Sequence, residues 1–104
     1  MKKSLTIELY EFSQIEGIDD ESLLKAIYKA QSRFFKKQEG FINGVLLKAE
    51  DKWVNISYWN SMEEAKQAHK LFLDHSSCLP FIQMISPSTE KITYLQRIMS
   101  FKKI

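Results

Sequence analysis

Apolar and polar residues alternate over several short stretches of this chain, which predicts strands. Residues 4–12 alternate closely, and residues 41–49 and 53–60 are rich in β-branched and aromatic residues. The last two stretches are separated by a connection of hairpin length, so we expect them to pair antiparallel. Residues 92–101, with apolar residues on mixed faces, predict a fourth strand.

Apolar residues recur at helical spacing between the first two predicted strands. A cap at Asp19 or Asp20 would begin a helix, and Gly40 would end it. The predicted buried stripe consists of Leu23, Ile27, Ala30 and Phe34, widened by Leu24 and Phe35.

A second helix begins at Ser61, where Ser61 and Glu64 have the spacing of a capping box. At about 100° per residue, one face of this helix carries Met62, Ala65, Ala68, His69 and Phe72. His69 is therefore expected to face the protein interior. Pro80 then predicts a break and a short helical turn within residues 74–84, and Pro87 marks its exit.

The order βαββαβ predicts an α+β, ferredoxin-like fold, with two helices on one face of a four-stranded antiparallel sheet. The opposite sheet face is expected to be too apolar to remain in water. We assign to that face Tyr10, Phe12, Trp53, Trp59 and either Tyr94 or Met99 with Phe101. A second copy of the same sheet would cover it, which predicts a homodimer.

Composition indicates one globular domain over residues 1–104, because 44% of the residues are hydrophobic and 27% are charged. No apolar run approaches the roughly 20 residues that cross a bilayer. With its single cysteine, Cys78, the chain is expected to be cytoplasmic and not membrane-bound. Its net charge is only +2 and its lysines are scattered, which argues against nucleic acid as a partner.

The same element order also describes RNA-recognition domains, which stack bases on strand aromatics. Tyr10, Trp53 and Trp59 allow that alternative, but the third predicted strand lacks the basic-glycine-aromatic run of those domains.

Two motifs resemble the antibiotic-biosynthesis-monooxygenase group of dimeric α/β barrels. The first is EGFING at residues 39–44, and the second is YWNSMEEAKQAH at residues 58–69. The resemblance implies the dimeric barrel fold. It also implies a cofactor-independent oxygenase that oxidises a small aromatic or quinone-forming molecule with O₂, without metal or flavin. The group also contains proteins without known activity, so a non-catalytic ligand-binding or stress-associated barrel is the alternative.

Haem-degrading members of this group have an asparagine on the first strand and a tryptophan within the second helix. Neither is present here, since Trp59 precedes that helix. Their haem ligand is a histidine beyond that tryptophan, and Cys78 or a shifted His75 could approach its position. Haem degradation is therefore disfavoured.

His69 is the candidate catalytic base, because a histidine exchanges protons near neutral pH; the alternative is a structural histidine. The candidate substrate-binding residues are Asn43, Asn55, Trp59, Tyr28 and Phe72, with Ser57 as a further polar strand residue. For Trp59, Tyr28 and Phe72 the alternative is core filling. No metal site is expected, because His69, Asp74 and His75 lack the paired spacings of zinc ligands. Cys78 follows His75 by three residues, a spacing that would bring the two together on a helix and support a thiolate nucleophile. Pro80 argues against a regular helix there.

Overall fold

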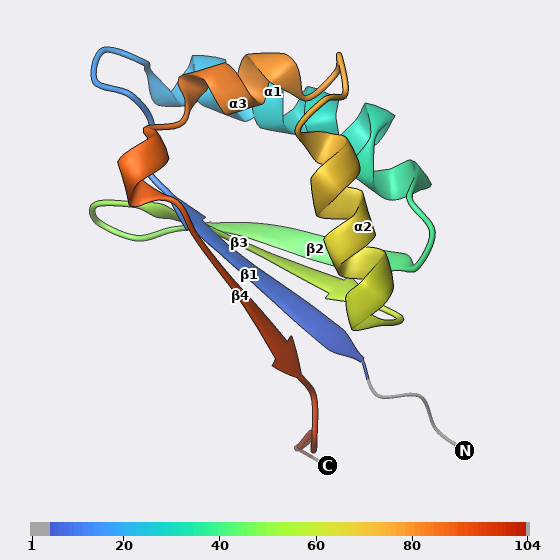
Figure 1. Cartoon of the computed structure of the whole chain (residues 1–104). Helices are drawn as coiled ribbons and strands as arrows, with labels where there is room; N and C mark the ends of the chain where they lie inside the picture. Colours follow the sequence, from blue (N-terminus) through green and yellow to red (C-terminus); the bar gives the residue numbers. More distant parts are fainter. Residues whose placement is uncertain (1–4, 104) are drawn as a thin grey trace.

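The computed structural model describes residues 5–103. Its strands and main helices follow the order βαββαβ, and short helical segments are added in the connections (Figure 1). The elements are β1 Thr6–Phe12, α1 Asp20–Arg33, the 3-10 turn η1 Phe35–Lys37, β2 Phe41–Lys48, β3 Trp53–Trp59, α2 Met62–Phe72, α3 Leu79–Met84, the 3-10 turn η2 Pro87–Thr89 and β4 Lys91–Gln96.

The four strands form one antiparallel sheet in the order β2-β3-β1-β4. The helices lie together on one face of this sheet, as Figure 1 shows. The central strand β1 pairs with β3 and β4, so that Glu8 lies between Ser57 and Tyr94. The predicted α+β ferredoxin-like fold is confirmed.

The two faces of the sheet are reversed relative to the prediction. Tyr10, Phe12, Trp53 and Trp59 are all at most 6% exposed and lie under the helices. Tyr94 packs against the same side. Strand alternation separates two sets of side chains but does not identify the covered set. The bulky aromatic set fills the space between sheet and helices.

The face without helices carries a smaller apolar set instead. This face, which we call the open face, alternates with the buried one, and its aliphatic residues are Ile7, Leu9, Val45, Leu47, Val54, Ile56 and Leu95. Val45, Leu47 and Leu95 are 47%, 50% and 45% exposed. The sheet therefore has an apolar face without helices, as predicted, but other residues than the predicted ones form it.

Helix α1 begins at the predicted cap, where the Asp19 carboxylate accepts from the Ser22 N–H. It ends at Arg33, so the predicted end at Gly40 is wrong. Phe34 and Phe35 explain this early end, because both rings contact Phe72, at centroid distances of 6.5 and 5.3 Å. A continued helix would turn the second ring about 100° away from the first.

Helix α2 is capped as predicted, with the Ser61 hydroxyl accepting from the Glu64 N–H at 3.1 Å. Ala65, Ala68 and Phe72 are buried, but Met62 is 39% exposed, which corrects the predicted face at its first residue. The short helix α3 begins with Pro80 in its first turn, as expected.

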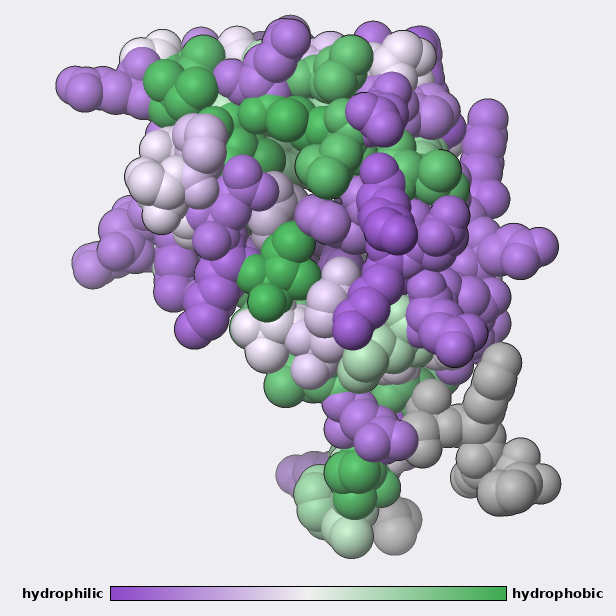
Figure 2. Space-filling model, in the orientation of Figure 1, coloured by the Kyte–Doolittle hydropathy of each residue, from purple (hydrophilic) through white to green (hydrophobic). Residues whose placement is uncertain are grey.

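Strand β4 ends at Gln96, so the predicted strand to residue 101 is too long. Gln96 pairs with Thr6, the first residue of β1, and no described strand lies beyond it. Ile98, Met99 and Phe101 are 81%, 68% and 85% exposed, and Figure 2 shows this hydrophobic C-terminal segment below the body of the molecule. Figure 2 also shows hydrophobic side chains over the helical layer at the top.

Candidate functional site

An enclosed pocket lies between the sheet and the helices, and we call it the inner pocket. Its polar lining consists of Glu8, Tyr10, Gln31, Asn55 and His69. Its apolar lining consists of Phe12, Ile27, Phe35, Leu46, Phe72 and Phe81. The inner pocket has a volume of about 10 Å³, which is room for one water molecule.

Glu8 is the buried carboxyl of the inner pocket, and only 4% of it is exposed. Its Oε1 accepts from the Ser57 hydroxyl at 3.5 Å, and that hydroxyl accepts from the Trp59 indole N–H at 2.8 Å. Its Oε2 is buried and has no hydrogen-bond partner among residues 5–103. Burial raises the pKa of Glu8, and the nearby hydroxyls of Tyr94 and Ser57 offset part of that rise.

His69 lies on the inward face of α2, as predicted, and its ring lies among aromatic side chains. It meets Tyr10 edge-on at a centroid distance of 6.1 Å and Phe72 at 5.6 Å. Burial lowers the pKa of His69, and the negative charge of Glu90 offsets part of the decrease. Within residues 5–103, no side-chain hydrogen bond occupies its ring nitrogens. His69 is therefore an uncharged imidazole available to accept a proton.

Tyr10 connects the inner pocket to the surface. Its hydroxyl donates to Glu90 Oε2 at 2.6 Å. Burial, together with this bond and the charge of Glu90, raises the pKa of Tyr10 far above its ordinary value of 10. Tyr10 therefore stays protonated and forms a fixed wall beside His69.

An open groove of about 530 Å³ adjoins the inner pocket at the edge strand β2. Ile27, Gln31, Leu46 and Asn55 line both cavities, so the inner pocket is reached between α1 and β2. The groove is large enough for a small ligand. A second groove, of about 490 Å³, lies between η1 and α2, but none of the ionisable side chains that line it is buried.

The inner pocket brings together three of the predicted site residues: His69, Asn55 and Phe72. Asn43 lies in the adjoining groove. Trp59 packs against Ala65 and Ala68 and reaches the site only through Ser57. The functional role of each stays a prediction.

Tyr28 does not lie between helix and sheet, so its predicted location is wrong. It is 74% exposed, because it follows the buried Ile27 and is turned about 100° from the buried stripe of α1. The space is filled instead by Phe35, Phe72 and Phe81.

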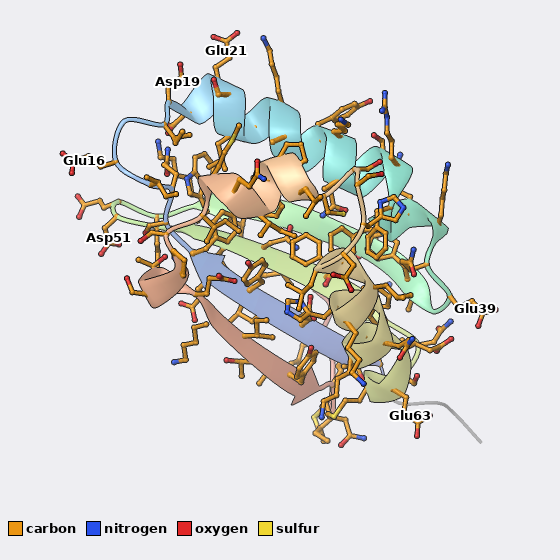
Figure 3. The ribbon with its side chains drawn as sticks, turned by 45° about the horizontal axis from the view of Figure 1, so that its top comes forward. Glu16, Asp19, Glu21, Glu39, Asp51 and Glu63 are labelled. Atoms are coloured by element: carbon orange, nitrogen blue, oxygen red, sulfur yellow. The ribbon has the colours of Figure 1, made fainter. Side chains whose placement is uncertain are left out.

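Glu8 is the site residue that sequence reasoning missed. A signal was present in the sequence, since Glu8 falls on the same alternating face as Tyr10 and Phe12, the face predicted to be too apolar for water. The carboxylates of Glu16, Asp19, Glu21, Glu39, Asp51 and Glu63 all point outward in Figure 3, whereas Glu8 is only 4% exposed.

Cys78 is fully buried, and burial raises the pKa of its thiol to about 11. It is therefore a thiol at neutral pH, which agrees with a packing role. Within residues 5–103, no group of three or more metal-ligating side chains is placed to hold an ion. None of the described helices is long and apolar enough to span a bilayer.

No family model and no curated protein matches this sequence. Solved structures do match over nearly the whole chain. SnoaB, a cofactor-independent oxygenase from Streptomyces nogalater, is 15% identical, with a TM-score of 0.62 and 95% and 96% of the two chains covered. A monooxygenase from the ActVA-Orf6 gene of Streptomyces coelicolor, in complex with nanaomycin D, is 10% identical, with a TM-score of 0.65 and 98% and 95% covered.

A protein of unknown function from Nitrosomonas europaea has the same arrangement, with 12% identity, a TM-score of 0.68 and 98% and 97% of the two chains covered. At these identities the likeness is one of fold. The resemblance predicted from the two sequence motifs is confirmed at that level: this chain has the fold of the antibiotic biosynthesis monooxygenases.

Proposed function

We propose that this protein is a cofactor-independent monooxygenase that acts on a small aromatic, quinone-forming substrate in the inner pocket. The observation that carries the proposal is an uncharged His69, set among aromatic rings, whose ring nitrogens make no side-chain hydrogen bond within residues 5–103. The fold shared with SnoaB, a cofactor-independent oxygenase, supports it.

In the proposed reaction, His69 takes the proton of a phenolic hydroxyl. The resulting anion transfers electrons from a ring carbon to O₂, and a carbon–oxygen bond forms. The peroxide then takes up a proton, the ring C–H proton leaves, and the O–O bond breaks to release water. Phenol and O₂ thus become quinone and water. A pocket closed to water would protect the anion.

The substrate has to widen the inner pocket, because an aromatic ring does not fit into about 10 Å³. Gln31 and Leu46 are among the residues that line both this pocket and the adjoining groove, so we expect their side chains to move. The small volume favours the second candidate function, a non-catalytic barrel whose interior is filled by Phe35, Phe72 and Phe81.

Aerobic oxidation of 1,5-dihydroxynaphthalene tests the oxygenase proposal, with O₂ uptake and quinone absorbance measured together. We expect one O₂ consumed per quinone formed. His69→Gln should lower kcat/KM by roughly 10² to 10⁴, the usual effect of removing a general base. Wild-type kcat/KM should rise with pH through a pKa below 6.5, because burial favours the neutral imidazole.

His75→Gln is the matched control, because the His75 Nδ1 accepts from the Ser77 N–H outside the inner pocket. It should leave kcat/KM unchanged. Turnover that survives His69→Gln, or that both variants lower equally, would exclude His69 as the base. No turnover by the wild type would favour the non-catalytic candidate.

We also propose that the protein is a homodimer in which two open faces pack against each other. The support is the apolar character of this face, together with the exposed Ile98, Met99 and Phe101 that follow β4. A self-complementary sheet face closes as a two-fold dimer without another partner.

A further inference from the structure

One oxygen of Glu8 is held in place while the other is left free at the inner pocket. The Ser57 hydroxyl donates to Oε1, and Trp59 orients that hydroxyl. Glu8 belongs to the central strand β1, paired on both sides, so its backbone has little freedom. The free Oε2 is therefore a positioned group and not a mobile surface charge.

This free oxygen is costly unless it finds a partner. A buried polar atom without a hydrogen bond costs about 1–3 kcal/mol, and more if it is charged. Oε2 accepts no hydrogen bond among residues 5–103, although the Tyr94 hydroxyl lies near this carboxyl. The walls around it are mainly aromatic, and His69 is the other ionisable group of the inner pocket that lacks a fixed hydrogen bond.

Two hydrogen-bonding groups in an aromatic cavity define a ligand with two polar substituents. We propose that Glu8 Oε2 accepts a hydrogen bond from a second hydroxyl of the aromatic substrate, while the reactive hydroxyl faces His69. Glu8 is then the group that selects dihydroxylated over monohydroxylated aromatics. This inference rests on the proposed function for the identity of the ligand, but it concerns binding and not turnover.

The test is anaerobic binding of 1,5-dihydroxynaphthalene and of 1-naphthol, measured by tryptophan fluorescence. Without O₂ the probes stay intact. The wild type should bind the diol more tightly than 1-naphthol by roughly 10-fold to 100-fold, the contribution expected of a hydrogen bond to a carboxyl group. Glu8→Gln should abolish most of this preference.

Glu11→Gln is the matched control. Glu11 lies on the same strand but on the opposite face, where its carboxylate pairs with Lys52 at 2.7 Å. This variant should keep the full preference for the diol. If Glu8→Gln also keeps it, or if the wild type binds neither probe, the inference is overturned and Oε2 is satisfied by water alone.

A second measurement needs no variant that might fold poorly. In protein carrying ¹³C-labelled glutamate, the carboxyl resonance of the buried Glu8 should shift with the diol and not with 1-naphthol. Equal shifts would contradict the inference.

A preference for the diol that depends on Glu8, without any oxidation, would support this inference and exclude the oxygenase proposal. Oxidation without such a preference would do the reverse.

Discussion

At the scale of single residues, burial shifts the pKa values of Glu8 and His69 in opposite directions. Desolvation raises the pKa of the carboxyl and lowers that of the imidazole, so both shifts favour the uncharged form. Both side chains line the inner pocket, between a strand and a helix that come from opposite halves of the chain. The same low-polarity surroundings thus suit a neutral base and an aromatic ligand.

Glu8 should make the folded state less stable as the pH rises. Its pKa is raised on folding, so the unfolded chain releases this proton first, from about pH 4.5 upward. The contribution of Glu8 to stability is therefore fully present below that pH. It is lost progressively as the pH rises towards the folded pKa of Glu8. Urea unfolding from pH 4 to 8 should show Glu8→Gln gaining stability relative to the wild type with rising pH.

Glu11→Gln should show the opposite trend in the same experiment. The hydrogen bond to Lys52 lowers the pKa of Glu11, so its contribution is present at neutral pH and lost on acidification. The effect should be small because the Lys52 side chain is about half exposed to solvent. A stability difference between wild type and Glu8→Gln that does not change with pH would mean that Glu8 titrates as in water.

At the scale of elements, three chain segments meet at Gly40. Gly40 precedes β2 with a φ of +83°, and its carbonyl accepts from the Asn60 N–H at 2.8 Å. The Glu64 side chain that accepts from the Ser61 hydroxyl lies directly over it. The cap of α2 and the start of β2 are therefore built as one unit.

Gly40→Ala should destabilise the protein more than Gly17→Ala does. Both glycines have positive φ, which costs another residue about 1–2 kcal/mol. A Cβ at Gly40 would also come within 2.5 Å of the Glu64 Cδ, whereas a Cβ at Gly17 meets nothing within 4 Å. Thermal unfolding of both variants measures the difference, and equal losses would show that Glu64 moves aside freely.

At the scale of the whole molecule, the helices cover one sheet face and leave the open face without a helical cover. That face lies on the side of the sheet away from the helices in Figure 1. Its exposed members sit on both outer strands, with Val45 and Leu47 on β2 and Leu95 on β4. The apolar surface thus extends across the sheet, which is the geometry that a second sheet covers well.

Val45→Glu should convert a dimer into a monomer, because it places a charge within the proposed interface. Leu24→Glu is the control, since Leu24 is similarly exposed, 43% against 47%, but lies on α1. Native mass spectrometry should give a dimer for the wild type and for Leu24→Glu. A monomeric wild type at tens of micromolar, or a dimer in both variants, would contradict an interface through the open face.

The sequence by itself determined the order of the elements, the caps of α1 and α2, and the side of α2 that carries His69. These features depend on local spacing and on neighbouring residues, which the chain carries wherever it folds. The fold of the antibiotic-biosynthesis-monooxygenase group was also predictable, because the motifs that resemble this group lie in two short contiguous stretches.

Only the tertiary structure decided which face of each strand lies under the helices. Both alternating sets of β1 contain apolar residues, so alternation alone left two equivalent arrangements, and the volume of the aromatic set decided between them. The same decision buried Glu8, turned the open face outward and placed a carboxyl in the same pocket as His69. The end of β4 was likewise set by its partner strand, because a strand extends only as far as its neighbour offers hydrogen bonds.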